Sequence, residues 1–147
     1  MEKMRRKVSL DFPPVPAAKR RDPQVRRQMS GPAMRTFFNV VEAWKLNNEE
    51  QRALLGWPPE STFYNYKAGK VSTLPYDTLM RISLVLGIYK DLQILYPEPA
   101  LAHQWVKLPN RSPLFGGRTA MVLMSEGGMD ALYRVRRLLD GRRGGWN

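Results

Sequence analysis

Residues 49–69 read Glu-Glu-Gln-Arg-Ala-Leu-Leu-Gly-Trp-Pro-Pro-Glu-Ser-Thr-Phe-Tyr-Asn-Tyr-Lys-Ala-Gly, two short helical stretches separated by a glycine and two prolines. The first stretch is apolar on one side at residues 53–55. Gly56 permits a sharp turn after it, because glycine adopts positive φ at little cost. Pro58 and Pro59 then prevent this helix from continuing. The pattern therefore predicts two helices joined by a tight turn.

The second stretch is predicted to begin at Ser61 and Thr62, whose hydroxyls can cap free backbone amides, and to run to Gly69. Phe63 and Tyr66 form its inward face. The remaining polar side chains are of the kind that reach bases and phosphates from a helix in the major groove, so we expect a DNA-binding helix-turn-helix. The candidate DNA-binding residues are Ser61, Thr62, Tyr64, Asn65, Lys67 and Lys70. A helical hairpin of any other function shows the same pattern, and that alternative stays open at this point.

Composition limits the class of protein. A chain of 147 residues with 43% hydrophobic residues can bury one core or two small ones. The absence of cysteine excludes disulfides and thiolate metal sites, and it is consistent with a reducing cytoplasm, where we expect the protein to act. No apolar run approaches the roughly 18 residues of a membrane span, and the basic N-terminus lacks the apolar region of a secretory signal.

The formal net charge of +11 favours an anionic partner, but the charge is concentrated at the two ends. Residues 1–30 and 107–147 are strongly basic, whereas residues 31–106 carry equal numbers of acidic and basic side chains. Phosphate attraction in the helix-turn-helix would therefore come locally from Lys67 and Lys70 and otherwise from the ends. A basic end could equally bind an acidic protein or be plain solvated surface.

Apolar spacing predicts an all-α fold. Residues 1–31 form a proline-containing basic arm, and a helix is expected from Pro32, with Met34, Phe37, Phe38, Val41 and Trp44 on one face. Asn48 is expected to cap the following helix. After Gly69, a helix is predicted from Pro75 to Gly87, and a separate short helix over residues 88–96.

The remainder of the chain is also predicted to be helical. We expect a helix at residues 98–107, a loop at 108–119, a short helix at 119–126, and a last helix from Asp130 to Gly141. In the last helix, Leu132, Val135, Leu138 and Leu139 lie on one side and Arg134, Arg136 and Arg137 largely off it.

Residues suited to catalysis are few. The single His103 is expected to be structural or at the surface, and Gly116-Gly117-Arg118 lacks the lysine and the preceding strand of a phosphate-binding loop. Glu126, Asp130 and Asp140 fall near helix ends, where capping explains them. We therefore expect no catalytic residues, no metal site and no cofactor, and an enzyme is the least favoured class.

Several segments together resemble the Xre/MbcA/ParS antitoxins over about residues 33–147. The segments are 48–56, Ser61-Thr62-Phe63, 81–90, Trp105-Val106-Lys107-Leu108-Pro109-Asn110 with Phe115-Gly116-Gly117, and Leu138-Leu139-Asp140. The resemblance implies the antitoxin of a bacterial type II toxin–antitoxin pair. Such a protein joins an Xre-like helix-turn-helix, which represses its own operon, to a C-terminal half that covers the active-site cleft of a RES-domain toxin that degrades NAD⁺.

Carried onto this chain, the resemblance implies an Xre/Cro-like helix-turn-helix domain at 32–96 and a small helical toxin-binding domain at 97–147. The toxin contact would fall on Arg134, Arg137, Arg142, Arg143, Gly144, Gly145 and Trp146. Operator DNA is the second expected partner, bound by a homodimer that places two helices in successive major grooves. Two alternatives remain: a stand-alone regulator whose C-terminal half only dimerises, and a module that recruits another protein.

Overall fold

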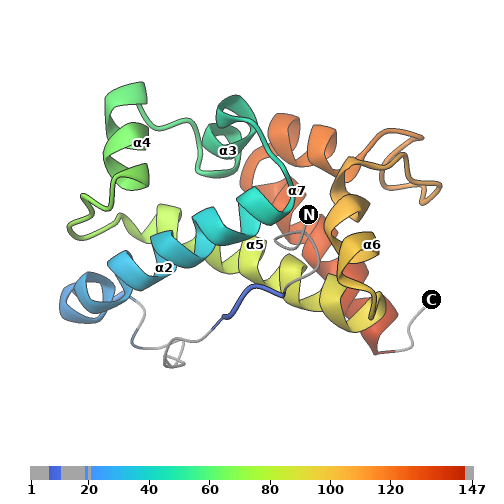
Figure 1. Ribbon diagram of the computed structural model, residues 1–147, viewed down its shortest axis with the longest axis horizontal. Helices are drawn as coiled ribbons and strands as arrows, with labels where there is room; N and C mark the ends of the chain where they lie inside the picture. Colours follow the sequence, from blue (N-terminus) through green and yellow to red (C-terminus); the bar gives the residue numbers. More distant parts are fainter. Residues whose placement is uncertain (1–6, 11–18, 20, 145–147) are drawn as a thin grey trace.

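The computed structural model describes residues 7–10, 19 and 21–144, and Figure 1 shows that this part of the chain is built from helices. The helices are α2 (Pro23–Ala43), α3 (Asn48–Leu54), α4 (Glu60–Lys67), α5 (Tyr76–Leu95), α6 (Pro99–Gln104), the 3₁₀ helix η2 (Trp105–Lys107) and α7 (Ala120–Arg143). The described residues contain no strand, and a single bridge pairs Pro109 with Thr119. The predicted all-α class is confirmed.

Helix α2 begins nine residues earlier than expected, at Pro23 rather than Pro32. The side chain of Asp22 caps it by accepting a hydrogen bond from the amide of Gln24 (2.9 Å), and proline suits the first helical position because its φ is already helical. The sequence Asp22-Pro23 is thus a start signal that the analysis of apolar spacing missed. Residues 23–31, expected in the arm, belong to the first helix, and Pro32 lies inside it.

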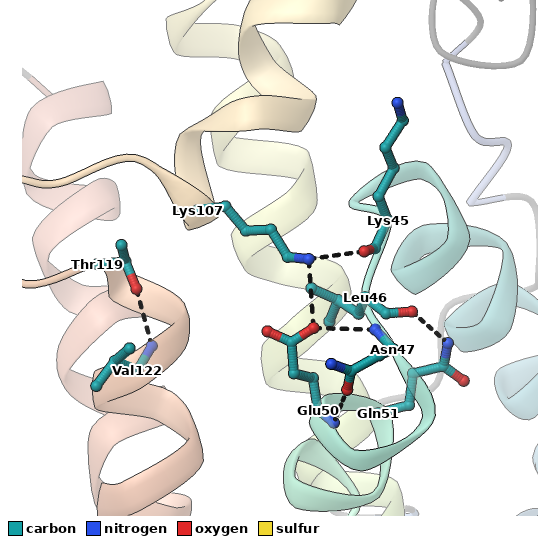
Figure 2. Close-up of polar contacts among 8 residues, drawn as sticks. All are labelled: Lys45, Leu46, Asn47, Glu50, Gln51, Lys107, Thr119 and Val122. Carbon is teal, nitrogen blue, oxygen red and sulfur yellow. Dashed lines mark hydrogen bonds and ion pairs between the residues drawn. The ribbon is translucent and has the colours of Figure 1, made fainter.

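Helix α3 begins with a capping box, shown in Figure 2. The cap is Asn47 and not Asn48: its side chain accepts from the amide of Glu50 (2.8 Å), whose carboxylate accepts from the amide of Asn47 (2.9 Å). Beyond α3, Gly56 has the expected positive φ, +84°. Trp57 follows with φ +61°, so two successive residues make the turn in the left-handed region.

Helix α4 begins at Glu60, immediately after Pro58-Pro59. The cap residue is Pro59, and no side chain caps the helix, so the expected capping by Ser61 and Thr62 is wrong. The two prolines already fix the backbone in the extended conformation that precedes a helix. At the other end Gly69 has φ +82°, and the amide of Lys70 donates to the carbonyl of Asn65 (2.9 Å).

Helix α5 runs without a break from Tyr76 to Leu95, so the predicted stop at Gly87 is wrong. Gly87 is buried, and a Cβ atom at this position would lie 1.2 Å from Nη1 of Arg136. The glycine therefore provides room for an arginine of α7 and does not end the helix. This function cannot be recognised locally, since Arg136 lies 49 positions further along the chain.

Helix α7 contains the two predicted helical segments, joined at a kink where Gly128 has φ +63° and ψ −150°. Its first turn is capped by Thr119, which accepts from the amide of Val122 (3.1 Å; Figure 2). The helix continues to Arg143, with Gly144 as its cap, two residues beyond the expected end at Gly141.

One hydrophobic core joins all these elements. Helix α5 lies at its centre and packs against α2, α6 and α7, and α7 also contacts α3. Trp44 of α2 and Tyr89 of α5 meet with ring centroids 6.3 Å apart. Among the residues that the structure describes, no helix has both the length and the apolar character needed to cross a lipid bilayer.

Lys107 links the end of η2 to the start of the helix-turn-helix, as Figure 2 shows. Its ammonium group donates to the carbonyl of Lys45 (2.7 Å) and lies 3.3 Å from the carboxylate of Glu50. The same carboxylate belongs to the capping box of α3. The expected helix-turn-helix and toxin-binding halves are therefore connected by polar contacts as well as by the core.

Candidate functional site

The predicted DNA-reading helix, α4, presents its polar residues outward. Phe63 is fully buried and packs edge-on against Phe38 of α2, with centroids 5.9 Å apart. This contact fixes the rotation of α4, because the residues opposite Phe63 must then face solvent. Five of the six candidate DNA-binding residues are exposed and Thr62 is half-buried; the five are Ser61, Tyr64, Asn65, Lys67 and Lys70.

Two of these candidates are tied to the first helix of the motif through Asn48. Lys67 donates to the side-chain oxygen of Asn48 (2.8 Å), and the side-chain nitrogen Nδ2 of Asn48 donates to the hydroxyl of Tyr64 (3.3 Å). The ammonium of Lys67 also lies 5.5 Å from the centre of the Phe63 ring. Asn48 was expected only as a cap, so its part in this site was missed.

The turn between α3 and α4 is held by arginines. Arg52 donates from Nε and Nη2 to the carbonyl of Pro58 (3.1 and 2.9 Å) and lies 5.6 Å from the centre of the Trp57 ring, which is 50% exposed. Arg81 fills the other side, since a Cβ at Gly56 would be 2.8 Å from its Nε. These contacts hold the proline-containing turn and so set the position of α4.

The predicted toxin-binding residues lie at the C-terminal end of α7. Arg134, Arg137, Arg143 and Gly144 are exposed and Arg142 is half-buried, whereas Gly145 and Trp146 lie outside the described residues. Arg134 pairs with Asp130 one turn earlier (3.1 Å). Arg137 makes no ion pair with any described residue, so it is the side chain most available to a partner.

Asp91, which sequence analysis did not single out, anchors this end of α7 to α5. Its fully buried carboxylate lies 2.8 Å from Nη1 of Arg143 and 3.2 Å from Nε of Arg136. Arg136 in turn pairs with Asp140 (2.8 Å). Arg143 is therefore held against α5 by its ion pair with Asp91. Asp140 was expected only to lie near a helix end, and in the structure it also pairs with Arg136.

The two carboxyl groups in this cluster have displaced pKa values. Burial and the neighbouring Asp140 raise the pKa of Asp91 to about 6, although Arg143 and Arg136 oppose the change. Burial alone would raise the pKa of Asp140, but hydrogen bonds from Asp91 and Arg136 lower it. Asp91 is thus the member of the pair that holds a proton more readily.

His103 has a structural environment. It is buried, stacks on Tyr89 with ring centroids 5.7 Å apart, and its Nε2 lies 3.2 Å from the tyrosine hydroxyl. That hydroxyl accepts the amide of Val8 (2.7 Å), so residues 7–10 are attached to α5. Burial raises the pKa of Tyr89, which favours the neutral phenol beside His103.

The remaining candidates give no sign of chemistry. Gly116 and Gly117 both have positive φ, and the amide of Arg118 donates to the carbonyl of Phe115 (3.0 Å), as in a tight turn. Arg118 pairs with Glu126 (2.8 Å). Within the described ranges, no three histidine or carboxylate side chains are grouped as a metal site would require.

Comparison with known proteins defines the class. Residues 23–87 match the helix-turn-helix domain of Xre-like antitoxins, and residues 91–145 match the C-terminal toxin-binding domain of the antitoxins Xre, MbcA and ParS. The chain belongs to the Xre/MbcA/ParS antitoxin family, with a DNA-binding and a toxin-binding domain. Its partners are accordingly a toxin and DNA.

A relative of similar length is the uncharacterized protein y4oB of Sinorhizobium fredii strain NGR234. It is 39% identical over 112 residues, which cover 76% of this chain and 84% of the relative. No solved structure matches the chain. The matched region of the first domain begins at residue 23, the first residue of α2, and ends at Gly87, where Arg136 crosses α5.

Proposed function

We propose that this chain is the antitoxin of a type II toxin–antitoxin pair whose toxin is a RES-domain enzyme that degrades NAD⁺. The antitoxin blocks the toxin's active site and represses its own operon, without catalysis of its own. The observation that carries the proposal is the occurrence, in one chain and in this order, of both family domains. The sequence resemblance supplies the kind of toxin.

The toxin-binding surface in this proposal is the C-terminal end of α7 with the tail that follows it. Arg134 and Arg137 are exposed there, and the anchoring of Arg143 by Asp91 gives the surface a fixed position. An arginine surface is suited to hot-spot contacts, since arginine is enriched among the residues that dominate binding energy at interfaces. Trp146 and Gly145 complete the proposed contact.

The DNA-binding surface is the outward face of α4, presented by a homodimer in the cytoplasm. Ser61 and Asn65 are exposed, and Asn65 makes no side-chain hydrogen bond within the described part of the chain. Short polar side chains in that situation suit contacts with base edges. Lys67 and Tyr64 are held by Asn48 and contribute a fixed shape and charge.

The test is co-expression with the neighbouring reading frame, followed by co-purification and an assay of NAD⁺ consumption by the partner. A chain truncated after Gly144 is the sharpest variant, because it removes residues 145–147 and leaves the Asp91–Arg143 ion pair intact. Substitution Arg137→Ala tests the helix itself. We expect a stable complex with the intact chain and recovered NAD⁺ consumption with each variant.

Two results would contradict the proposal. If the partner co-purifies but does not consume NAD⁺ in any combination, the toxin is of another kind. If no complex forms, the chain acts as a stand-alone regulator, and the C-terminal domain has a different partner. Lys90→Ala is a suitable control, since this exposed residue of α5 has no ion pair with any described residue.

A further inference from the structure

Helix α2 carries basic side chains on the face that it turns toward the DNA-reading helix. Phe38 marks that face, because its ring lies against Phe63 and 5.9 Å from the ammonium of Lys67. Arg27, Gly31 and Arg35 precede Phe38 at spacings of three and four, so they lie along the same face. Together they extend it by roughly 16 Å toward the N-terminal end of the helix.

The connection between α4 and α5 is attached to the same part of α2. The hydroxyl of Ser30 accepts from the amide of Leu74 (2.8 Å), and Arg26 donates to the carbonyl of Leu74 (3.3 Å). Lys70 lies in this connection and is exposed. Figure 1 shows α4, the connection and the N-terminal end of α2 at one end of the molecule, away from α6.

This end of the molecule is basic. From residue 21 to residue 35 there are four arginines, and the one acid, Asp22, is the helix cap. Arg26 is engaged with Leu74, and Arg21 lies over the ring of Tyr76 (5.2 Å). Arg27, Arg35 and Lys70 are exposed and have no ion pair or side-chain hydrogen bond with a described residue.

The helix-turn-helix was predicted to lie in a neutral region, with its first helix beginning at Pro32. With α2 beginning at Pro23, the matched domain at 23–87 carries eight basic and five acidic residues. Three of those acids lie at the opposite end, since Glu42 is in the last turn of α2 and Glu49 and Glu50 are in the first turn of α3. The excess positive charge therefore collects near Arg27 and Arg35.

We propose that Arg27 and Arg35 of α2, with Lys70, form a second DNA contact that binds backbone phosphates beside the groove occupied by α4. The proposal rests on DNA binding through the outward face of α4, because the two surfaces must engage one duplex. DNA fits better than an acidic protein, since the basic face of α2 meets an exposed residue of α4 at Phe38, where the ammonium of Lys67 lies 5.9 Å from the ring. Phosphate contacts position a protein on DNA and add affinity of little sequence dependence.

The test is the salt dependence of duplex binding by the full chain. The probes are a duplex from upstream of its reading frame and an unrelated duplex of equal length. The variants are Arg27→Ala/Arg35→Ala and, as control, Lys90→Ala/Arg111→Ala, which removes two exposed charges elsewhere. Each phosphate contact contributes roughly 0.9 to the slope of log affinity against log salt. We expect the first variant to lower the slope by about two on both duplexes, and the control to leave it unchanged.

A third variant, Arg27→Lys/Arg35→Lys, keeps the charge and should keep most of the slope. An unchanged slope in the alanine variant overturns the proposal. So does a variant that keeps the slope but no longer co-purifies with the toxin, because the basic face would then serve an acidic protein. If the wild-type chain binds both duplexes equally, the proposed operon repression is contradicted. The phosphate contact is not contradicted by that result, and the salt slopes of the variants still test it. Binding to neither duplex overturns both.

Discussion

At the residue scale, Asp91 makes stability depend on pH. Its pKa rises from an ordinary value of 3.8 to about 6 in the folded chain, chiefly through burial. The folded state therefore binds this proton more tightly than the unfolded chain, so the contribution of Asp91 is fully stabilising below the ordinary value. That contribution is lost as pH rises through about 6. The lowered pKa of Asp140 acts at lower pH, because its stabilising contribution disappears only as pH falls through its folded value.

Asp91→Asn should remove this dependence, because the amide does not titrate and still offers an oxygen to Arg143. We expect the free energy of unfolding of the wild type to fall, relative to that of the variant, as pH rises from about 4 to about 7. Denaturant titrations at intervals across that range measure both. Parallel pH profiles for the two proteins would show that Asp91 titrates alike in the folded and unfolded states.

At the scale of whole elements, two helical glycines should respond oppositely to alanine. Gly31 in α2 has space for a Cβ, whose nearest neighbour would be Nη1 of Arg35 at 3.5 Å. Gly87 in α5 does not, because Arg136 occupies the position. Gly31→Ala should raise the free energy of unfolding by roughly 0.5–1 kcal/mol, the usual helical preference for alanine.

Gly87→Ala should lower the free energy of unfolding instead, by about 1–3 kcal/mol, because displacement of Arg136 leaves Asp91 only partly paired. Urea unfolding of the pair provides the comparison, since both changes carry the same gain in helix preference. Equal stabilisation by both substitutions would show that Arg136 moves aside without loss.

The same elements show which parts of the fold are predictable from sequence. Helix α3, the turn at Gly56 and the outward face of α4 were predicted, because their signals are local: apolar spacing, a glycine and two prolines. The continuity of α5 was not predicted, because the need for glycine at position 87 arises only from the packing of Arg136 against it. In the candidate sites, apolar spacing predicted the polar side of α4 and the arginines that lie off the apolar side of the last helix. The contacts of Asn48 and Asp91 were not predicted, since each is defined by partners on another helix.

At the scale of the whole molecule, the DNA-binding and toxin-binding domains share one core. Leu132, Val135 and Leu139 of α7 belong to the same buried cluster as Val85 and Ile88 of α5. Helix α7 also contacts α3, and Lys107 joins η2 to the cap of α3. A partner bound to α7 is therefore separated from α3, the first helix of the helix-turn-helix, only by α7 itself.

The shared core predicts a single cooperative unfolding transition. A two-state transition requires that neither domain be stable without the other, and α5 without α7 would expose buried apolar residues together with the carboxylate of Asp91. Calorimetry of the full chain should therefore give equal calorimetric and van't Hoff enthalpies. A fragment ending at Gly87 should show little helical circular dichroism. Two transitions, or a helical fragment, would mean that the domains fold independently. If the transition is single, point substitutions and not domain deletions must separate DNA binding from toxin binding, because a deletion would unfold both.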